Sequence, residues 1–198
     1  MPSGTAPGAT ASPAPAETDR ARQVDGLPIG FGSLRLEDVS LDLTAGPLRL
    51  RVTPLDEDIT RLTAPDTSER LAAARARIDG PHTVFLVAVE TEAPGGVDFD
   101  PLDLEIATRG TVHRASEIRA LTRGWGAGRL EQRRPEQALY LFPESVDPTE
   151  EWVVRYGAAR NEGWAARIPR LEAERARVRA RSGGQAQSSS SPNFLILR

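Results

Sequence analysis

Four carboxylates lie close together around residue 100 and form the strongest ionic feature of the sequence. They are Asp98, Asp100, Asp103 and Glu105. Oxygen ligands of this kind suit Ca²⁺, although their spacing does not match an EF-hand loop. Solvated carboxylates in and beside a turn are the alternative interpretation. The sequence therefore predicts no cofactor, with calcium at this cluster as the open alternative.

Other catalytic constellations are weak. His82 and His113 are the only histidines, and they lie too far apart for a metal-ligand spacing. A triad of Ser116, His113 and an aspartate can be written down, but no Gly-x-Ser-x-Gly nucleophile elbow occurs. Cysteine and lysine are absent, which excludes thiol catalysis, Cys-ligated zinc, iron–sulfur clusters, Schiff-base lysines and a P-loop lysine. A non-enzymatic protein is predicted.

A glycine-rich stretch at 124–128 surrounds Trp125. It does not fit a phosphate loop, because no strand precedes it, no clear helix follows it and no lysine is present. Trp125 with Arg123 or Arg129 forms a candidate interaction patch, since tryptophan and arginine dominate interface hot spots. A loop anchored by one tryptophan is the alternative.

The C-terminal part of the chain is rich in arginine. Six arginines and two glutamates fall between residues 167 and 181. Arg175 and Arg179 are the interface candidates on this predicted helix. A solvated helix with internal Glu–Arg pairs is the alternative.

Alternating apolar residues, punctuated by turn formers, indicate the elements that position these candidates. The predicted strands are 34–43 with a β-bulge near residue 37, 48–52, 83–91, 102–107, a short one around 112, 138–142 and 152–156. Both parities are apolar in 83–91, so this strand is expected at the centre. Helices are predicted at 66–78, with Asp66 as its cap, and at 165–181; residues 115–136 are expected to be loop.

These elements predict a mainly β protein, an antiparallel β-sandwich of about seven strands with one inserted helix and a C-terminal helix. The predicted organisation is a flexible linker at 1–30, the sandwich at 31–160, an arginine-rich helix at 161–181 and a flexible tail at 182–198. The 198 residues carry a net charge of -3 and are 39% hydrophobic. That charge gives no drive toward nucleic acid. No apolar run is long enough for a transmembrane helix.

Three stretches support a family resemblance. They are Phe99–Leu104 (FDPLDL), Ala138–Pro143 (ALYLFP) and Trp152–Gly157 (WVVRYG). In this respect residues 32–157 resemble bacterial extracytoplasmic immunoglobulin-like domains of the DUF4352 type. The resemblance implies an immunoglobulin-like sandwich and no established catalytic site, so no functional residue carries over.

The leading functional hypothesis is a non-catalytic binding or accessory module with a protein partner. The composition of residues 1–30 is typical of a lipoprotein tether, and a terminus without a function is the alternative interpretation. A tether predicts an extracytoplasmic location, with a lipid anchor outside this chain as one option; a native start at Met1 would favour the cytoplasm. One alternative is a metal-dependent or hydrolytic enzyme that uses the 98–105 cluster with His113. Another is a structural subunit joined to a larger assembly through the C-terminal helix and tail.

Overall fold

The computed structural model describes residues 27, 28 and 30–188. The predicted linker therefore lies almost wholly outside the described residues, as does the part of the predicted tail from 189 to 198. Residues 182–188, expected to be tail, instead continue the C-terminal helix, which runs over Ile168–Ser188.

The described chain is mainly β, with eleven strands in antiparallel sheets. The strands are β1 (Leu41–Ala45), β2 (Leu48–Pro54), β3 (Thr83–Thr91), β4 (Val97–Asp98), β5 (Leu104–Thr108), β6 (Thr111–Arg114), β7 (Glu117–Ala120), β8 (Arg129–Leu130), β9 (Glu136–Phe142), β10 (Trp152–Tyr156) and β11 (Ala159–Asn161). A five-stranded sheet has the order β1-β2-β3-β9-β7, and a four-stranded sheet has the order β11-β10-β5-β6. Strands β4 and β8 pair separately.

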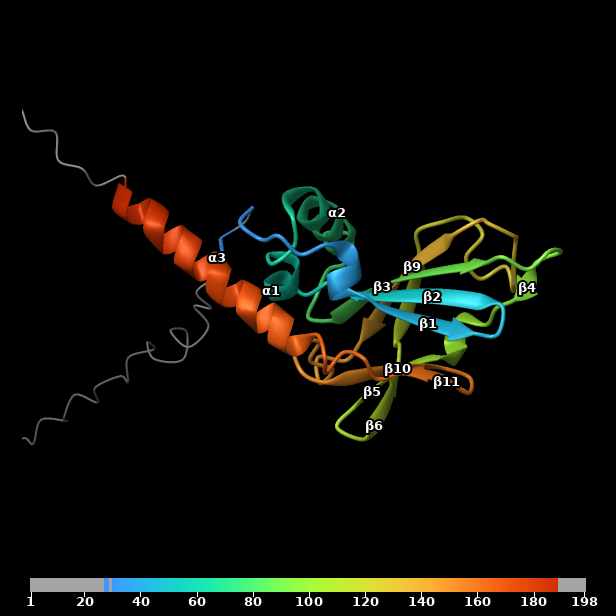
Figure 1. The fold of residues 1–198 in the computed structure, drawn as a ribbon. Coiled ribbons are helices and arrows are strands. Elements are labelled where there is room, and N and C mark those ends of the chain that lie inside the picture. The colour runs from blue at the N-terminus through green and yellow to red at the C-terminus, as the bar shows by residue number, and fades with distance from the viewer. Residues whose placement is uncertain (1–26, 29, 189–198) are drawn as a thin grey trace, which may run out of the picture.

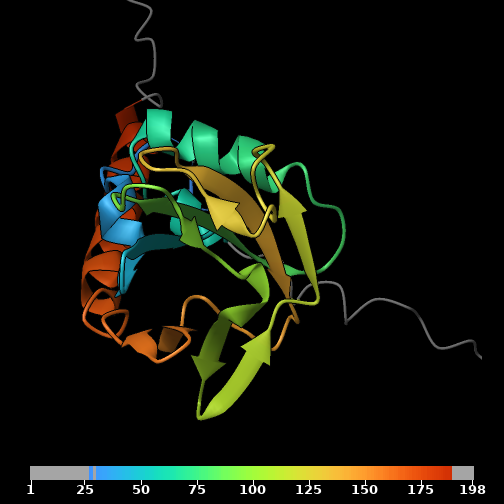
Figure 2. The ribbon, with the colours of Figure 1, turned by 90° about the vertical axis from the view of Figure 1, so that its right-hand side faces the viewer.

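The two large sheets face each other across one core (Figures 1 and 2). Phe85 of β3 packs edge-on against Trp152 of β10, with ring centroids 5.2 Å apart. At one side the Asn161 side-chain amide of β11 donates to the Asp42 carbonyl of β1 at 2.6 Å. This confirms the predicted mainly β, sandwich-like arrangement; the immunoglobulin-like topology stays a prediction.

Three helices accompany the sheets. They are α1 (Glu57–Thr60), α2 (Pro65–Arg75) and α3 (Ile168–Ser188). Helix α2 lies across the outer face of the five-stranded sheet (Figure 2). The expected cap at Asp66 is wrong: Ala64 is the N-cap, without a side-chain hydrogen bond, and Pro65 occupies the first turn. Proline's fixed φ favours a helix that starts there.

Two expectations about strands are corrected. Residues 34–43 do not form one bulged strand, because a 3-10 turn at Leu36–Val39 precedes β1. That turn is closed by the Arg35 N–H donating to the Asp38 carboxylate at 2.9 Å and by the Ser40 hydroxyl donating to the Leu36 carbonyl at 2.6 Å. The expected loop at 115–136 contains β7 and β8. Both strands are too short for alternation to mark them clearly.

Helix α3 docks through its first half and then runs away from the sheets (Figure 1). Leu171 and Val178 are buried, and Trp164, just before the helix, packs against Trp152 with centroids 4.7 Å apart. The Trp164 indole donates to the Pro148 carbonyl at 3.1 Å. No helix in the described part of the chain is long and apolar enough to cross a membrane.

The N-terminal segment 31–38 is held between α3 and the body of the protein. The Glu174 carboxylate accepts hydrogen bonds from the backbone N–H and the hydroxyl of Ser33, both at 2.9 Å. Arg170 pairs with Asp38 at 2.8 Å. Arg167 and Arg181 donate to backbone carbonyls of the same segment. We call this set of contacts the α3 clasp.

Candidate binding groove

The outer face of the five-stranded sheet carries two adjoining hollows. The first, which we call the α2 groove, has a volume of about 480 Å³ and lies between α2 and strands β2, β3 and β9. The second, the strand hollow, has a volume of about 380 Å³ and lies over β1, β2 and β3. Arg51 and Ala88 line both, so the two hollows form one trough across the sheet.

Strand alternation builds the floor of the α2 groove. Side chains alternate between the two faces of a sheet, so Leu50 and Val52 enter the core while Arg51 faces outward. Arg51 is paired across the ladder with Ala88, and Ala88 with Gln137. The small Ala88 side chain leaves space between two longer neighbours, which hollows the face at this row.

Helix α2 supplies the opposite wall. Leu71 is buried and Ala74 is half-buried against the sheet side. Arg70 and Arg77 flank this apolar stripe and remain exposed on the rim. Arg70 lies within α2, and Arg77 lies in the turn that follows the end of the helix at Arg75, yet both line the groove.

The α2 groove is electropositive. Arg51, Arg70 and Arg77 line it, and no aspartate or glutamate does. Arg51 binds the Asp42 carboxylate in a bidentate pair, with N–O distances of 2.7 and 3.2 Å, and this hydrogen bonding raises the pKa of the guanidinium. The side chains of Arg70 and Arg77 have no hydrogen bond or ion pair within the described residues. Their donors are therefore available to a ligand.

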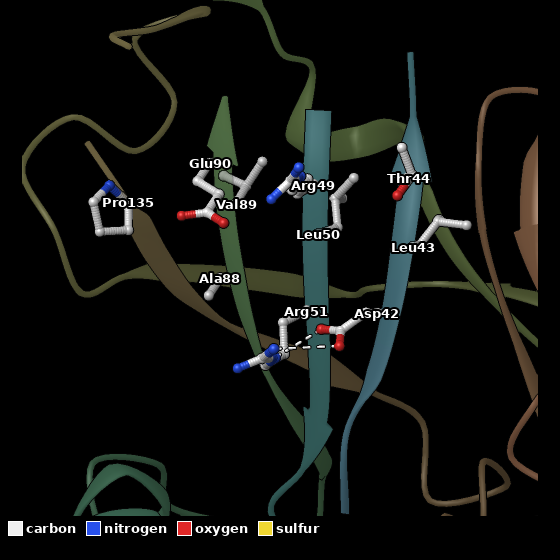
Figure 3. A pocket seen from close by; sticks show the side chains of 10 residues that line it. All are labelled: Asp42, Leu43, Thr44, Arg49, Leu50, Arg51, Ala88, Val89, Glu90 and Pro135. Carbon is white, nitrogen blue, oxygen red and sulfur yellow. Dashed lines mark hydrogen bonds and ion pairs between the residues drawn. The ribbon is translucent and has the colours of Figure 1, made fainter. Parts of the chain in front are cut away.

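The strand hollow is closer to electrical balance. Figure 3 shows Arg49 and Arg51 from β2 beside Asp42 from β1 and Glu90 from β3. Arg49 and Glu90 are direct partners in the strand register. The excess positive charge of the trough thus lies at its α2 end.

A larger pocket of about 800 Å³ lies between α1, α2 and the start of β3. Several of its charged groups serve the fold. Asp56 caps α1 by accepting from the Ile59 N–H at 3.1 Å, and Arg61 pairs with Glu57 and donates to the Leu27 carbonyl at 2.6 Å. Arg75 donates to the carbonyls of residues 78 and 80. Although this pocket is larger than the α2 groove, it is the weaker candidate for a binding site, because these charged side chains already bind other groups of the chain.

The predicted calcium ligands are only partly brought together. Asp98, Asp100 and Asp103 line one shallow hollow of about 500 Å³, but Glu105 does not. Asp98 pairs with Arg129 at 3.4 Å, and Glu105 pairs with Arg114 at 3.0 Å.

Asp100 accepts from the Leu102 N–H at 2.9 Å, so it caps the local turn. Within the described residues, no group of three acidic, histidine or cysteine side chains is arranged to hold a metal ion. Calcium binding stays a prediction.

The histidines are not assembled with a nucleophile. His113 on β6 shares a hydrogen bond with the Thr108 hydroxyl at 3.0 Å, and the Ser116 hydroxyl donates to the Leu141 carbonyl at 3.1 Å. His82 lies in the α1–α2 pocket. Among the described residues neither histidine is hydrogen bonded to a carboxylate, so the geometry offers no support for the triad.

The Trp125 patch is directed inward more than the sequence suggested. The Trp125 ring is half-buried and packs edge-on against Phe99 and Tyr140, with centroids 5.2 and 5.9 Å away. Arg129 pairs with Asp98 and also donates to the Gly95 carbonyl. Arg123 is exposed. These contacts agree with a loop anchored by tryptophan, and a role in recognition stays a prediction.

The two interface candidates on α3 lie beside the clasp. Arg175 is half-exposed, and Arg179 has an interaction partner in the described chain. The residues that sequence reasoning missed are Arg70 on α2 and Arg77 in the turn just after it. Their spacing beside an apolar stripe was a usable signal, but only the fold shows that the stripe faces a sheet with a hollow.

Comparison of the chain with family models, curated proteins and solved structures finds no match. Function therefore has to be inferred from the chemistry of the sites themselves.

Proposed function

We propose that this protein is a non-catalytic binding module whose α2 groove takes an acidic segment of a polypeptide partner. The observation that carries the proposal is the pair of exposed arginines, Arg70 and Arg77, without partners in the described chain, above a floor of leucine and alanine. Guanidinium groups bind carboxylates through paired N–H donors. The bidentate Arg51–Asp42 pair displays that chemistry at the same site.

A polypeptide fits the groove better than a nucleic acid. Single-stranded nucleic acid is generally held by aromatic side chains on which bases stack, and none lines this groove. The apolar half of the lining, which includes Leu86 and Leu121, suits aliphatic side chains. The partner segment should thus carry aspartate or glutamate next to leucine-like residues. The resemblance to DUF4352-type domains agrees with a non-catalytic role.

Fluorescence anisotropy with two labelled peptides tests the proposal. The first is a ten-residue probe with three aspartates and two leucines, and the second replaces each aspartate by asparagine. The full chain should bind the acidic peptide at least about tenfold more tightly, and added salt should weaken that binding. The Arg70→Glu/Arg77→Glu double variant should lose about tenfold or more in affinity.

A charge-matched control comes from the other sheet. Arg155→Glu/Arg160→Glu changes the net charge equally at two cross-strand neighbours on β10 and β11. It should leave peptide affinity within about twofold of wild type. If both double variants lost the same peptide affinity, the loss would be due to net charge and not to the groove. Preference for a single-stranded oligonucleotide over the peptide would overturn the choice of ligand.

We also propose that the module works outside the cytoplasm, tethered through residues 1–30, with a lipid anchor as one means of attachment. The Ala-, Pro-, Gly-, Ser- and Thr-rich composition of that segment supports this. Cell fractionation of the native host tests it: recovery in the envelope or periplasm is expected, and recovery in the cytoplasm would contradict it.

A further inference from the structure

We infer that a second copy of this chain is an occupant of the α2 groove, and that it enters with Leu102 at the tip of the 100–103 turn. The inference rests on the proposed function, since it names a partner for the same groove. Its starting point is exposure. Leu102 is 68% exposed, more than any other large hydrophobic residue in the described chain.

The turn that carries Leu102 is fixed and not a loose loop. The Asp100 carboxylate accepts from the Leu102 N–H at 2.9 Å. The Tyr140 hydroxyl donates to the Pro101 carbonyl at 2.8 Å, and the Tyr156 hydroxyl accepts from the Asp100 N–H at 3.0 Å. Tyr140 is fully buried, so the turn is tied to the core. Because these hydrogen bonds fix the 100–103 turn, the exposed Leu102 side chain is already in position for a contact and little conformational entropy is lost on binding.

The chemistry of the turn complements that of the groove. Asp100 and Asp103 flank Leu102, both are exposed, and neither forms an ion pair within the part of the chain described. In the groove, Arg70 and Arg77 flank an apolar floor and likewise lack partners there. Leucine between two carboxylates thus faces leucine and alanine between two arginines. Insertion would remove Leu102 from water and pair the four charges.

The two surfaces belong to different parts of the molecule, so the contact runs head to tail. The groove lies on the outer face of the five-stranded sheet, while the turn leads into β5 of the other sheet. The tyrosine hydrogen bonds hold the turn where it is, which prevents it from swinging into its own groove. Each molecule then offers one turn and one groove, and such heterologous contacts propagate into chains or close into rings.

The expected association is weak. One leucine and two exposed ion pairs make a small interface, well below the standard size of stable complexes. We expect a dissociation constant on the order of 100 μM to 1 mM. Sedimentation velocity on the full chain should show a monomer at about 10 μM and average masses beyond the dimer at about 1 mM.

Complementation between two variants tests the contact. Leu102→Asp should abolish binding by the turn, and Arg70→Glu/Arg77→Glu should abolish binding by the groove. Both variants change exposed side chains, and circular dichroism checks that each remains folded. Each variant alone should stay monomeric at about 1 mM. Their equimolar mixture should form dimers and stop there, because only one intact turn and one intact groove remain. Val112→Asp, at the other exposed large hydrophobic residue, should associate like wild type.

Three results would overturn the inference. They are a wild-type chain that stays monomeric at every concentration, variants that still associate, and a mixture that stays monomeric. The acidic-peptide assay, run at low protein concentration, separates this failure from failure of the proposed function. Peptide binding by a monomeric wild type would refute the second copy and leave the groove's function standing, whereas loss of both would refute both.

Discussion

The arginines of the α3 clasp and the two arginines on the rim of the α2 groove, Arg70 and Arg77, differ in what they contact. Arg170 of α3 pairs with Asp38, while Arg181 of α3 and Arg167, just before the helix, donate to backbone carbonyls of the N-terminal segment. On the α2 side, Arg70 and Arg77 point to a groove and bind nothing within the described residues. These arginines beside the clasp therefore serve the fold, as does Arg75 of α2 through the carbonyls of residues 78 and 80, whereas Arg70 and Arg77 offer donors to a ligand. Local density of charge is a poor guide to a binding site; unsatisfied donors beside a hollow are a better one.

The largest effect on stability should come from Gly32, in the segment 31–38 that the α3 clasp holds. A Cβ atom at this position would lie well inside contact distance of the Leu62 carbonyl group, which is backbone and cannot rotate away. Gly32→Ala should therefore lower the free energy of unfolding by about 3 kcal/mol, measured by urea denaturation. Gly46→Asn is the control, because that turn has φ 59° and open space around it, and asparagine tolerates such a conformation. If Gly32→Ala lowered the free energy of unfolding no more than Gly46→Asn does, the segment 31–38 would not be packed tightly against the Leu62 carbonyl group.

The next effect concerns Glu174, the buried carboxylate of the clasp. It is 1% exposed and accepts both Ser33 donors as well as the Arg177 guanidinium at 2.6 Å. Glu174→Ala removes the acceptor of the part-buried hydrogen bonds from the Ser33 N–H and hydroxyl and from Arg177, and it should cost about 2 kcal/mol in urea unfolding. Glu174→Gln keeps one acceptor oxygen and should cost about 1 kcal/mol. The exposed neighbour Glu172→Ala should change little, and a comparable loss there would indicate a general helix effect.

A direct test of the contrast removes one arginine from each helix. Asp38, the partner of Arg170, has a side chain only 11% exposed, so Arg170→Ala leaves a poorly solvated carboxylate and should cost about 1 kcal/mol. Arg70→Ala removes no hydrogen bond or ion pair in the described chain and should stay within about 0.5 kcal/mol. Binding of the acidic peptide should respond in the opposite order. If Arg70→Ala destabilised the fold as much as Arg170→Ala, the groove arginines would be structural after all.

The sequence predicted the sheets better than the sites because strands leave a periodic signal. Alternation located β2, β9 and β10, and the two-sided apolar run at 83–91 predicted a central strand, which is confirmed because β3 is the middle strand of the five-stranded sheet. The short strands β7 and β8 escaped, since their pairing is decided by neighbours distant in the chain. The C-terminal helix was predicted, but the contacts through which it docks were not. Burial of Glu174 depends on Ser33, a residue 141 positions away.

The candidate groove could not have been predicted by the same means. Its lining comes from the 3-10 turn at Leu36–Val39, α2 and the turn after it, β2, β3, β9 and the loop at 121–122, and only the fold brings these together. The sequence instead pointed to the carboxylates at 98–105 as a candidate site, because they are close together in the chain. Two of those four are paired with arginines contributed by β8 and β6, which no local pattern reveals.

The smallest effect depends on pH and concerns Asp56, the N-cap of α1, which lies outside both the α3 clasp and the α2 groove. Burial raises the pKa of this carboxyl, and nearby Asp58 and Asp147 add to the rise, against the hydrogen bond from Ile59. A raised pKa in the folded protein means that the folded state favours the protonated acid. Its contribution to stability is therefore complete below the unfolded pKa of about 3.9 and is lost as the pH rises through the folded pKa.

Asp56→Asn keeps the α1 cap, because asparagine caps helices about as well as aspartate, and it removes the buried charge. The variant should match or exceed wild type at about pH 7, by about 0.5 kcal/mol or less, and the difference should vanish near pH 3. Unfolding in urea across this range measures it. Peptide affinity of the α2 groove should not change, since its charged lining is arginine throughout. A wild type that gains on the variant as the pH rises would show that the charged form of Asp56 is stabilised by its cap more than burial opposes it.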